Sequence, residues 1–301
     1  MEKLVWKSPT IEELKDFGTL PFKGSDTSRV NLFLLRRKYK LEIAVAEGVL
    51  FRRYHGKGQN RQGYGFPLST GAPDYEKVFN LLKQDAGERG SLDFCLCDEE
   101  QKGIVSEYFD IEWQSEIGDN DYIYEGEKWV GLSGKKYEHL RNRMNRFNRM
   151  YEEVTYHPID SPERLRDAMA VSDIWQEEHV NNEMPREDLE EEHRSITEAA
   201  DHWQELGMTG GVLYVEGSPV AMTMASFLSN DCVDFHFDKA VGDFAAAGAT
   251  IVSRRNFALA DIAKGRPYFN LEEDMNIPGL RQSKETYRPL MKRAKYYGGV
   301  I

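Results

Sequence analysis

The order of helical and strand patterns is nearly the same in the two halves of this chain. In both halves helical segments come first, then three strand patterns, a helix, a further strand and a helix. The strand patterns lie at 39–46, 49–54, 63–68 and 92–97 in the first half, and at 211–216, 219–228, 232–239 and 268–271 in the second. The helical patterns lie at 11–17, 25–37, 74–82 and 98–108, and at 161–175, 186–206, 248–263 and 279–287. This order predicts an α/β fold in which helices cover a mixed sheet in each half.

The length of the chain agrees with two domains. A chain of 301 residues exceeds the size at which single cores usually stop growing. We predict an N-terminal domain at 1–130, a basic linking helix at 131–155, and a C-terminal domain at 156–301 that carries the site.

Composition excludes several classes of protein. The first residues, MEKLVWKSPTIEELKDF, mix charges with apolar residues and contain no apolar stretch of signal-peptide length. No apolar run is long enough to span a bilayer, and the net charge of -12 is not gathered in a tail. We therefore predict a cytoplasmic protein.

The three cysteines are too few and too scattered for a disulfide framework or a four-ligand zinc site. Cys95 and Cys97 alternate within an apolar strand pattern, where free cysteine behaves as a small hydrophobe. We expect them in the core, and we expect no metal site.

The charge reverses between the two halves. Residues 135–149 contain six basic residues and one acid in an otherwise acidic chain. Helical spacing places Leu140, Met144 and Phe147 on one face with arginines beside it. This segment is either a solvated linking helix or a surface for a phosphate-rich ligand such as tRNA or coenzyme A. The candidate phosphate or RNA ligands are Lys135, Lys136, Arg141, Arg143 and Arg146.

Two longer motifs carry a resemblance to a known family. They are LSGKKYEHLRNRMNRF at 132–147 and FNLEEDMNIPGLRQSKETYRP at 269–289. Shorter motifs, FHFDKA, SRVNLFLLRRKY and YGFPLS, extend the similarity over nearly the whole chain. The chain resembles the phosphatidylglycerol lysyltransferase C-terminal family. That resemblance implies two tandem acyl-CoA N-acyltransferase (GNAT)-like domains.

The resemblance also implies an activity. Characterised members of the family move an aminoacyl group from aminoacyl-tRNA to a lipid, and this chain lacks their membrane-embedded domain. The resemblance therefore implies an aminoacyl- or acyltransferase, with an amine or hydroxyl acceptor left open. No cofactor is certain, and aminoacyl-tRNA or acetyl-CoA is the expected co-substrate.

The phosphate cradle of acetyl-CoA enzymes is altered here. The usual Arg or Gln at its first position is replaced by Ala245, and Gly248 precedes the expected helix. The free amides of a helix N-terminus can still bind a phosphate, so Gly248 remains a candidate.

Acidic residues follow the strand pattern at 268–271. An open α/β sheet presents polar groups at the carboxyl ends of its strands. Glu273 or Asp274 could hold the ammonium group of an aminoacyl donor, or could deprotonate an acceptor amine if burial raises its pKa. Asn270 is a candidate for substrate binding. The alternative is an acidic N-terminal turn of a helix.

The last helical pattern carries basic residues. Arg281, Lys284 and Arg288 are spaced so that they share one helix surface, which suits a phosphate or ribose. Tyr287 could donate a proton to a leaving group, or could be an aromatic core residue.

The strand at 232–239 alternates polar and apolar residues. We expect Phe235 and Phe237 in the core, with His236 and Asp238 on the opposite, polar side together with Asp234. His236 is a candidate base, and Asp238 and Lys239 match the family motif and could orient the donor. A solvent-facing histidine and a strand-end ion pair are the alternatives.

Three functions remain open from the sequence. The first is aminoacyl or acyl transfer, with tRNA bound by the basic helix and a small-molecule or peptide acceptor. The second is a catalytically inert module that binds a small molecule or RNA. The third is an acetyl-CoA-dependent N-acetyltransferase.

Overall fold

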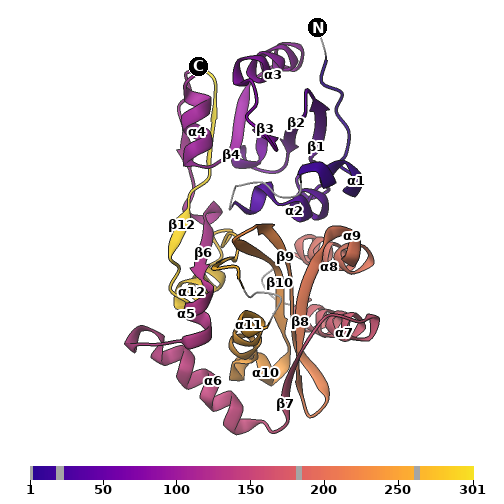
Figure 1. Cartoon of the computed structure of the whole chain (residues 1–301), viewed down its shortest axis with the longest axis vertical. Helices are drawn as coiled ribbons and strands as arrows, with labels where there is room; N and C mark the ends of the chain where they lie inside the picture. The colour runs from indigo at the N-terminus through magenta and orange to yellow at the C-terminus, as the bar shows by residue number, and fades with distance from the viewer. Residues whose placement is uncertain (1–2, 18–23, 181–184, 261–264) are drawn as a thin grey trace. The chain divides into compact units, whose positions relative to one another are not determined.

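The computed structural model describes residues 3–17, 24–180, 185–260 and 265–301 (Figure 1). These residues form two compact units, each built on one mixed sheet with helices against it. Unit 1 comprises Met1–Tyr122, Glu273–Leu280 and Lys292–Ile301, and unit 2 comprises Ile123–Glu272 and Arg281–Met291. The predicted α/β class is confirmed.

Unit 1 contains a six-stranded sheet in the order β1-β2-β3-β4-β13-β5. Its strands are β1 (Glu42–Ala46), β2 (Val49–His55), β3 (Gln62–Ser69), β4 (Asp93–Cys97), β5 (Gln114–Ser115) and β13 (Tyr296–Gly299). Its helices are α1 (Ile11–Leu14), α2 (Arg29–Leu34), α3 (Tyr75–Arg89) and α4 (Glu99–Ser106), with short 3-10 turns η1 (Lys15–Phe17), η2 (Ser25–Thr27), η3 (Gln59–Arg61) and η4 (Ile117–Asp119). The strands and helices predicted for the first half are confirmed to within three residues at each end, except that α3 continues to Arg89, beyond the pattern recognised at 74–82.

The core of unit 1 lies between α3 and the sheet. Val78, Phe79 and Leu82 of α3 pack in one buried cluster with Phe66 and Phe94 of the strands. Helix α3 begins where the sequence indicates, because the side chain of its N-cap, Asp74, accepts a hydrogen bond from the amide of Lys77.

The cysteines of β4 are core residues, as predicted. Cys95 and Cys97 are free and fully buried. Burial raises the pKa of the Cys95 thiol to about 12, so the thiol is un-ionised and unreactive at neutral pH.

The last strand of the chain belongs to the sheet of unit 1. Strand β13 pairs antiparallel with β4 on one side and with β5 on the other. Local periodicity does not specify which strand a short Gly-containing segment pairs with, so the sequence did not predict this return of the chain.

Unit 2 is built on the seven-stranded sheet, in the order β12-β6-β11-β10-β9-β8-β7. Its strands are β6 (Asp121–Glu125), β7 (Val154–Pro158), β8 (Met208–Val215), β9 (Ser218–Ser229), β10 (Cys232–Ala240), β11 (Tyr268–Asn270) and β12 (Met291–Arg293). Its helices are α5 (Gly126–Gly131), η5 (Lys135–Tyr137), α6 (Glu138–Met150), α7 (Pro162–His179), α8 (Arg186–Asp201), α9 (Trp203–Leu206), α10 (Gly242–Ala247), α11 (Ala249–Leu259) and α12 (Pro278–Thr286).

Helices cover both faces of the sheet of unit 2. Helix α7 packs on one face of β8–β10, and α11 packs on the other with α6 and α10 beside it (Figure 1). The predicted capping of α7 is confirmed, since the Ser161 side chain accepts a hydrogen bond from the amide of Arg164 and Pro162 is the first helical residue.

Two predicted helices have different bounds. The long helix expected at 186–206 is broken at His202 into α8 and α9. The helix expected at 248–263 is α11, which ends at Leu259; residues 261–263 of that prediction lie outside the described part of the chain.

A β-bulge in β10 corrects the predicted facing of its side chains. The register with β9 shifts between Phe235 and Phe237, which inserts one extra residue into β10. Asp234 and Phe235 lie before the bulge, and Asp238 lies after it. Asp238 is on the face of β10 that packs on α11, where it contacts Arg254. His236 and Asp238 do not share a solvent-facing side, because the alternation on which that prediction rests is interrupted between them.

Candidate functional site

Strands β10 and β11 pair only briefly in unit 2, and polar side chains follow the last pair. The parallel register runs from Cys232 with Tyr268 to Asp234 with Asn270. In α/β sheets, ligands bind outside the carboxyl ends of parallel strands. Glu272, two residues beyond the last pair, follows the carboxyl end of β11 and occupies the expected position of a functional site, and His236 lies beside it within β10.

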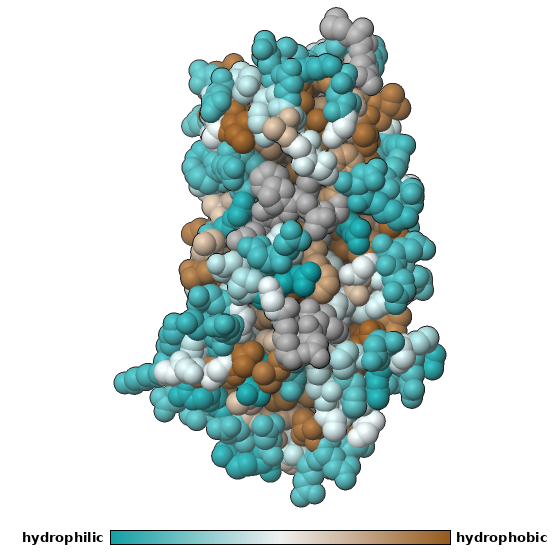
Figure 2. All heavy atoms as spheres, viewed as in Figure 1, coloured by the Kyte–Doolittle hydropathy of each residue, from teal (hydrophilic) through white to brown (hydrophobic). Residues whose placement is uncertain are grey.

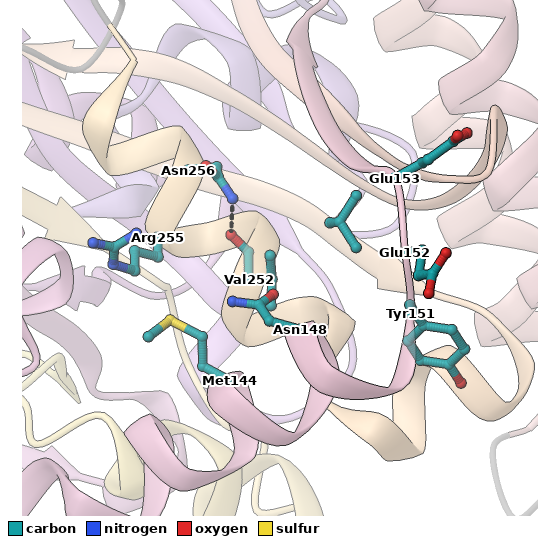
Figure 3. Close-up of a pocket in the computed structure, with 9 residues that line it drawn as sticks. Met144, Asn148, Tyr151, Glu152, Glu153, Val252, Arg255 and Asn256 are labelled. Carbon is teal, nitrogen blue, oxygen red and sulfur yellow. Dashed lines mark hydrogen bonds between the residues drawn. The ribbon is translucent and has the colours of Figure 1, made fainter.

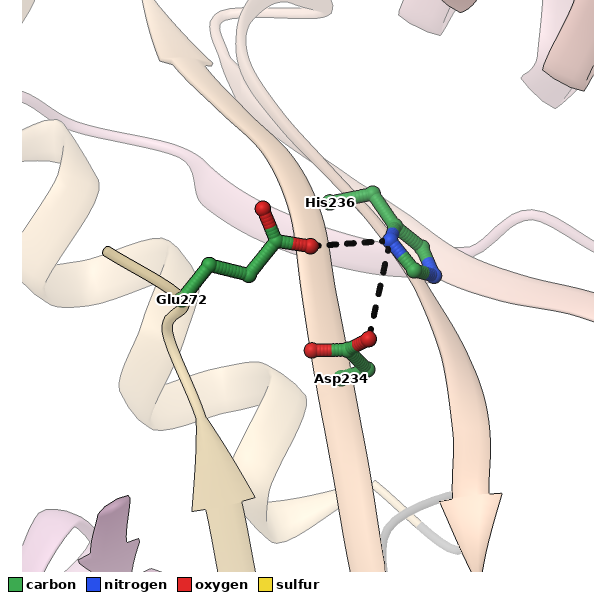
Figure 4. Close-up of side chains that lie close together, drawn as sticks. All are labelled: Asp234, His236 and Glu272. Carbon is green, nitrogen blue, oxygen red and sulfur yellow. Dashed lines mark hydrogen bonds and ion pairs between the residues drawn. The ribbon is translucent and has the colours of Figure 1, made fainter. Parts of the chain in front are cut away.

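His236 is hydrogen-bonded at both of its ring nitrogens. Its Nε2 lies 2.7 Å from Oγ of Ser226 on β9, and its Nδ1 lies 3.2 Å from Oε1 of Glu272. A carboxylate oxygen of Asp234 lies 3.9 Å from the same Nδ1. Figure 4 shows both carboxylates directed at this one nitrogen. We call Ser226, Asp234, His236 and Glu272 the histidine cluster.

The histidine cluster is buried except at one residue. The His236 side chain is only 1% exposed, whereas that of Glu272 is 23% exposed. The alternative interpretation, a solvent-facing histidine, is therefore wrong, because the ring is buried against Ser226, Asp234 and Glu272. Within the cluster, Glu272 is the group that a solute can reach first.

The backbone at Glu272 is held in an unusual conformation. Its φ is 56°, in the left-handed region that non-glycine residues seldom adopt. Its amide donates a 2.7 Å hydrogen bond to Oδ1 of the fully buried Asn270. Such a conformation costs about 1–3 kcal/mol and is maintained only where the surroundings fix it. The predicted substrate ligand Asn270 thus orients Glu272.

This arrangement suits proton transfer. A histidine that is bonded to a carboxylate at one nitrogen and to a hydroxyl at the other can take up a proton at one side and release one at the other. The reactive atoms of Asp234, His236 and Glu272 also lie within 4.8 Å of one another, so the same three side chains could hold a divalent cation. The sequence had predicted no metal site.

A second buried cluster lies on the α11 face of β10. Asp238 forms an ion pair with Arg254 of α11 and accepts a 3.0 Å hydrogen bond from Oγ1 of Thr223. The Arg254 guanidinium lies 4.5 Å from the ring centre of Tyr287. Burial raises the pKa of Tyr287 although Arg254 opposes the shift, so this tyrosine keeps its proton at neutral pH. Asp238 and Tyr287, both predicted site residues, therefore meet here through Arg254.

The remaining residue of the strand motif points to the other face. The Nζ of Lys239 lies 2.7 Å from a carboxylate oxygen of Glu192 on α8 and 3.4 Å from the ring centre of Trp175 on α7. Burial lowers the pKa of Lys239, and Glu192 partly opposes that shift. Lys239 is thus buried between an acid and an aromatic ring.

The altered phosphate cradle forms the start of α11. Gly248 has a φ of 118°, which glycine adopts without strain, and it separates α10 from α11. Nη2 of Arg143 on α6 donates a 3.2 Å hydrogen bond to the carbonyl oxygen of Ala246. An arginine from the basic helix therefore lies beside the N-terminal turn of α11.

The other basic candidates lie on η5 and α6. Leu140 and Phe147 are buried and Met144 is partly buried, which confirms the predicted apolar face. Arg141 donates to the carbonyl oxygens of Leu132 and Gly134, so it stabilises the preceding turn. The exposed candidates of this group are Lys135, Lys136 and Arg146.

The predicted basic surface of the last helix is not formed. Lys284 is buried, and its Nζ donates a 2.5 Å hydrogen bond to the carbonyl oxygen of Leu271. Helix α12 ends at Thr286, and Arg288 has a φ of 56° outside the helix. Arg281 is half-buried on the helix itself. The three side chains do not form one row, because helical spacing applies only within a helix.

Glu273 and Asp274 belong to unit 1. Glu273 lies 2.5 Å from Nη2 of Arg61 and 3.3 Å from Nζ of Lys295. Asp274 is fully buried; it accepts hydrogen bonds from the Tyr122 hydroxyl at 2.6 Å and from the amide of Asn276 at 2.9 Å.

The electrostatics of Glu273 oppose one of its predicted roles. Burial by itself raises the pKa of Glu273, but the Arg61 guanidinium and the Lys295 ammonium outweigh it and hold the pKa at about 2. Glu273 could act as a base near neutral pH only if burial raised its pKa, and this condition is not met.

Among the cavities in the described part of unit 2, two lie against η5 or α6. The larger, of about 510 Å³, lies between α6, the start of β7 and α11 (Figure 3). Glu152 and Glu153 oppose the single guanidinium of Arg255 there, a charge balance that does not suit a polyphosphate.

The smaller cavity, of about 330 Å³, lies among α5, η5 and the turn after α12. We call it the aromatic pocket, because four aromatic side chains line it. Its lining residues are Tyr124, Trp129, Tyr137, Tyr287, Lys128, Lys136, Arg288, Glu125, Pro289 and Leu290.

Sequence reasoning missed several members of these sites. Ser226 and Arg254 carry no motif signal, since a serine within a strand and an arginine within a helix are ordinary. Glu272 was one of three consecutive acids, and only its separation from Glu273 in the fold distinguishes it. Trp129 lay in a segment with no predicted element.

In the part of the chain that the structure describes, no helix combines the length and apolar character needed to cross a membrane. Figure 2 shows hydrophilic side chains over most of the viewed face, with small apolar areas between them.

The sequence of this chain matches a known family. The family described as "Phosphatidylglycerol lysyltransferase, C-terminal" matches residues 17–298. A search of curated proteins found no match.

Solved structures share the fold. A conserved protein of unknown function from Bacteroides thetaiotaomicron is similar with 26% identity and a TM-score of 0.87, over 99% of this chain and 100% of the other. L-PGS from Bacillus licheniformis has 17% identity and a TM-score of 0.64, over 98% and 93%. FemX has 9% identity and a TM-score of 0.58, over 99% and 98%. The predicted fold of two tandem GNAT-like domains is confirmed.

Proposed function

Because the chain belongs to the phosphatidylglycerol lysyltransferase C-terminal family, we propose that it transfers an aminoacyl group from aminoacyl-tRNA to a small amine or alcohol. The histidine cluster is the observation that carries this proposal. It offers a buried histidine with a partner at each nitrogen and one reachable carboxylate.

The chemistry requires a proton acceptor beside the nucleophile. In the proposed reaction, Glu272 binds the acceptor amine or hydroxyl and relays the proton that the acceptor loses to Nδ1 of the buried His236. The acceptor atom then forms a bond to the aminoacyl carbonyl carbon, and the ester bond to the ribose oxygen breaks. The ribose oxygen takes up the proton that the acceptor lost, returned from His236 through Glu272, so the products are the acylated acceptor and uncharged tRNA.

The surroundings of His236 favour this use. Asp234 and Glu272 both lie near Nδ1, and two carboxylates stabilise an imidazolium once it forms. The Ser226 hydroxyl fixes the orientation of the ring through Nε2. The predicted roles of Glu273, Asp274 and Tyr287 in catalysis stay predictions, and the proposed reaction does not require them.

The test follows loss of labelled aminoacyl groups from charged tRNA in a mixture of primary amines and alcohols. We expect the wild-type protein to accelerate this loss and His236→Gln to reduce the rate by at least about 100-fold, the usual contribution of a general base. His55→Gln is the matched control, because His55 also pairs with a carboxylate, 3.0 Å away on Glu42, but is exposed. Full turnover in His236→Gln would refute the proposal.

A second acyl donor, a coenzyme A thioester, is favoured by one observation, the basic surroundings of the N-terminal turn of α11. The amide of Gly248 itself donates to the carbonyl oxygens of Phe244 and Ala245, so the positive end of the α11 dipole and the neighbouring Arg143 guanidinium are what this place offers to a phosphate, as a coenzyme A thioester would need. Thermal stabilisation by coenzyme A, in the absence of any effect of charged tRNA, would select this donor.

A further inference from the structure

We propose that Asp234, His236 and Glu272 of the histidine cluster bind a divalent transition-metal ion of the Zn²⁺ type. Nδ1 of the histidine and one oxygen of each carboxylate are its protein ligands. The binding chemistry stands on unit 2 alone, and only the effect of the ion on aminoacyl transfer rests on the proposed function.

The three ligand atoms converge on one point (Figure 4). From Nδ1 of His236, Oε1 of Glu272 lies 3.2 Å away and Oδ2 of Asp234 lies 3.9 Å away, and all three atoms lie within 4.8 Å of one another. With metal–ligand bonds of about 2.0–2.2 Å, neighbouring ligands of one ion are about 3–3.5 Å apart. The ring nitrogen and Glu272 already have this spacing, and Asp234 needs to approach by only about half an ångström.

The hydrogen bond on the other side of the ring prepares Nδ1 for a metal. Nε2 of His236 lies 2.7 Å from the Ser226 hydroxyl, which can accept its proton. In that tautomer, Nδ1 presents a lone pair to the two carboxylate oxygens, and a cation between the three atoms turns their repulsion into attraction. Histidine ligands of metals almost always bond a partner through their other nitrogen, and Ser226 has the position of that partner.

The two carboxylates are also held in place before an ion arrives. Asp234 is fully buried within β10, with Ser226 opposite it on β9 and Asn270 opposite it on β11. The amide of Glu272 donates its hydrogen bond to Asn270, which fixes the backbone that carries the Glu272 side chain. Ligands that are positioned in advance bind with a smaller loss of conformational freedom.

The ligand types and their burial select the class of ion. Imidazole suits Zn²⁺ and related transition-metal ions, whereas Mg²⁺ and Ca²⁺ prefer sites of oxygen alone. Mg²⁺ also keeps several of its waters, and the side chains of His236 and Asp234, 1% and 0% exposed, leave little room for them. Zn²⁺ accepts three protein ligands and one open position, and the side chain of Glu272, 23% exposed, provides the side from which the ion enters.

The experiment titrates the metal-depleted protein, without a histidine tag, with Zn²⁺, Co²⁺ and Mg²⁺. We expect calorimetry to show tight binding of a single Zn²⁺ ion per chain and Co²⁺ to develop visible absorption bands that Zn²⁺ abolishes. Mg²⁺ should bind at least about 100-fold more weakly than Zn²⁺.

Substitution of single ligands separates this site from adventitious binding. Loss of an outer-shell partner of a metal typically costs about 10–100-fold in affinity, so Glu272→Gln and Asp234→Asn, which remove a ligand charge at constant size, should each cost at least about 100-fold. Ser226→Ala, which removes only the partner of the ring, should cost about tenfold. His55→Gln is the matched control, because His55 lies 3.0 Å from Glu42 in an exposed pair, and its Zn²⁺ affinity should be that of the wild-type protein.

Melting temperatures establish that each variant is folded, and Glu272→Gln decides the outcome if the variant of the buried Asp234 does not fold. The inference is overturned if Zn²⁺ does not bind at millimolar concentration, if Mg²⁺ binds as tightly, or if the folded Glu272→Gln protein binds Zn²⁺ as the wild-type protein does.

The ion occupies Nδ1 and Glu272, the atoms of the proposed proton relay, so saturating Zn²⁺ should inhibit aminoacyl transfer. Zn²⁺ binding by a protein that shows no transfer with or without the ion would overturn the proposed function and leave the metal site intact. Transfer by a protein that does not bind Zn²⁺ would have the reverse meaning.

Discussion

Unit 1 and unit 2 each bury a cluster of charged side chains, and the two clusters differ in what surrounds them. In unit 1, Lys295 lies between Asp26, Asp121 and Glu273, and Arg61 pairs with Glu273. These carboxylates are largely buried, and each lies within ion-pair distance of Lys295. In unit 2, the histidine cluster has one member, Glu272, that a solute can reach.

The difference separates a stabilising cluster from a reactive one. A carboxylate fixed by two cations has a pKa far below neutrality, so Glu273 cannot exchange a proton near pH 7. The histidine cluster instead holds a histidine bonded at both ring nitrogens and a carboxylate that a solute can reach. Residues 272–274 are three consecutive acids, and the fold places Glu272 in the histidine cluster, Glu273 beside Arg61 and Lys295, and Asp274 beside Tyr122.

The comparison predicts that loss of the central cation of unit 1 has the largest effect on stability. Lys295→Met would leave Asp26, Asp121 and Glu273 buried around an apolar side chain. Removal of one partner from a buried ion pair typically costs about 3–5 kcal/mol in the free energy of unfolding. Urea denaturation measures this loss.

Lys38→Met, which changes an exposed lysine of the same unit, should alter the stability by less than about 0.5 kcal/mol. A Lys295→Met protein as stable as this control would show that the cluster does not stabilise unit 1.

The pH dependence of stability gives a smaller effect. The folded pKa of Glu273 is about 2, below its ordinary value of 4.5, so its stabilisation is complete above about pH 5 and is lost as the pH falls towards 2. Burial raises the pKa of Asp26 despite its cations, so Asp26 contributes with the opposite sign. The comparison with Glu273→Gln therefore isolates the first contribution.

Glu273→Gln should lose less stability between pH 5 and pH 2 than the wild-type protein. The slopes of unfolding free energy against pH should differ by up to the equivalent of about one bound proton. Unfolding at a series of pH values measures it. Parallel curves for the two proteins would mean that Glu273 is not held ionised by its neighbours.

Much of the fold could be predicted because its signals are local. Ser161 with Pro162 indicates the start of α7, Asp74 indicates that of α3, and alternating apolar residues indicate β10. The buried cysteines of β4 follow from the same alternation.

The parts that were not predicted depend on pairings between distant segments. The bulge in β10 is a property of its register with β9, and it moves Asp238 to the face opposite to the one expected. The return of β13 to β4 brings Lys295 into unit 1, and no local pattern reports it. The ion partners of Glu273 could not be inferred for the same reason. The role of base was assigned to Glu273 on the expectation that burial raises its pKa, and the sequence does not show the two cations that lower it.

The neighbouring residues Glu272 and Glu273 give the most direct test of the proposal that the cluster of unit 2 is reactive and that of unit 1 is structural. Aminoacyl transfer and thermal stability should be measured side by side in Glu272→Gln and Glu273→Gln. We predict that Glu272→Gln remains stably folded and loses transfer by at least about 100-fold, while Glu273→Gln is less stable at neutral pH and, where folded, retains transfer. A folded Glu273→Gln protein without transfer, beside an active Glu272→Gln protein, would contradict the account.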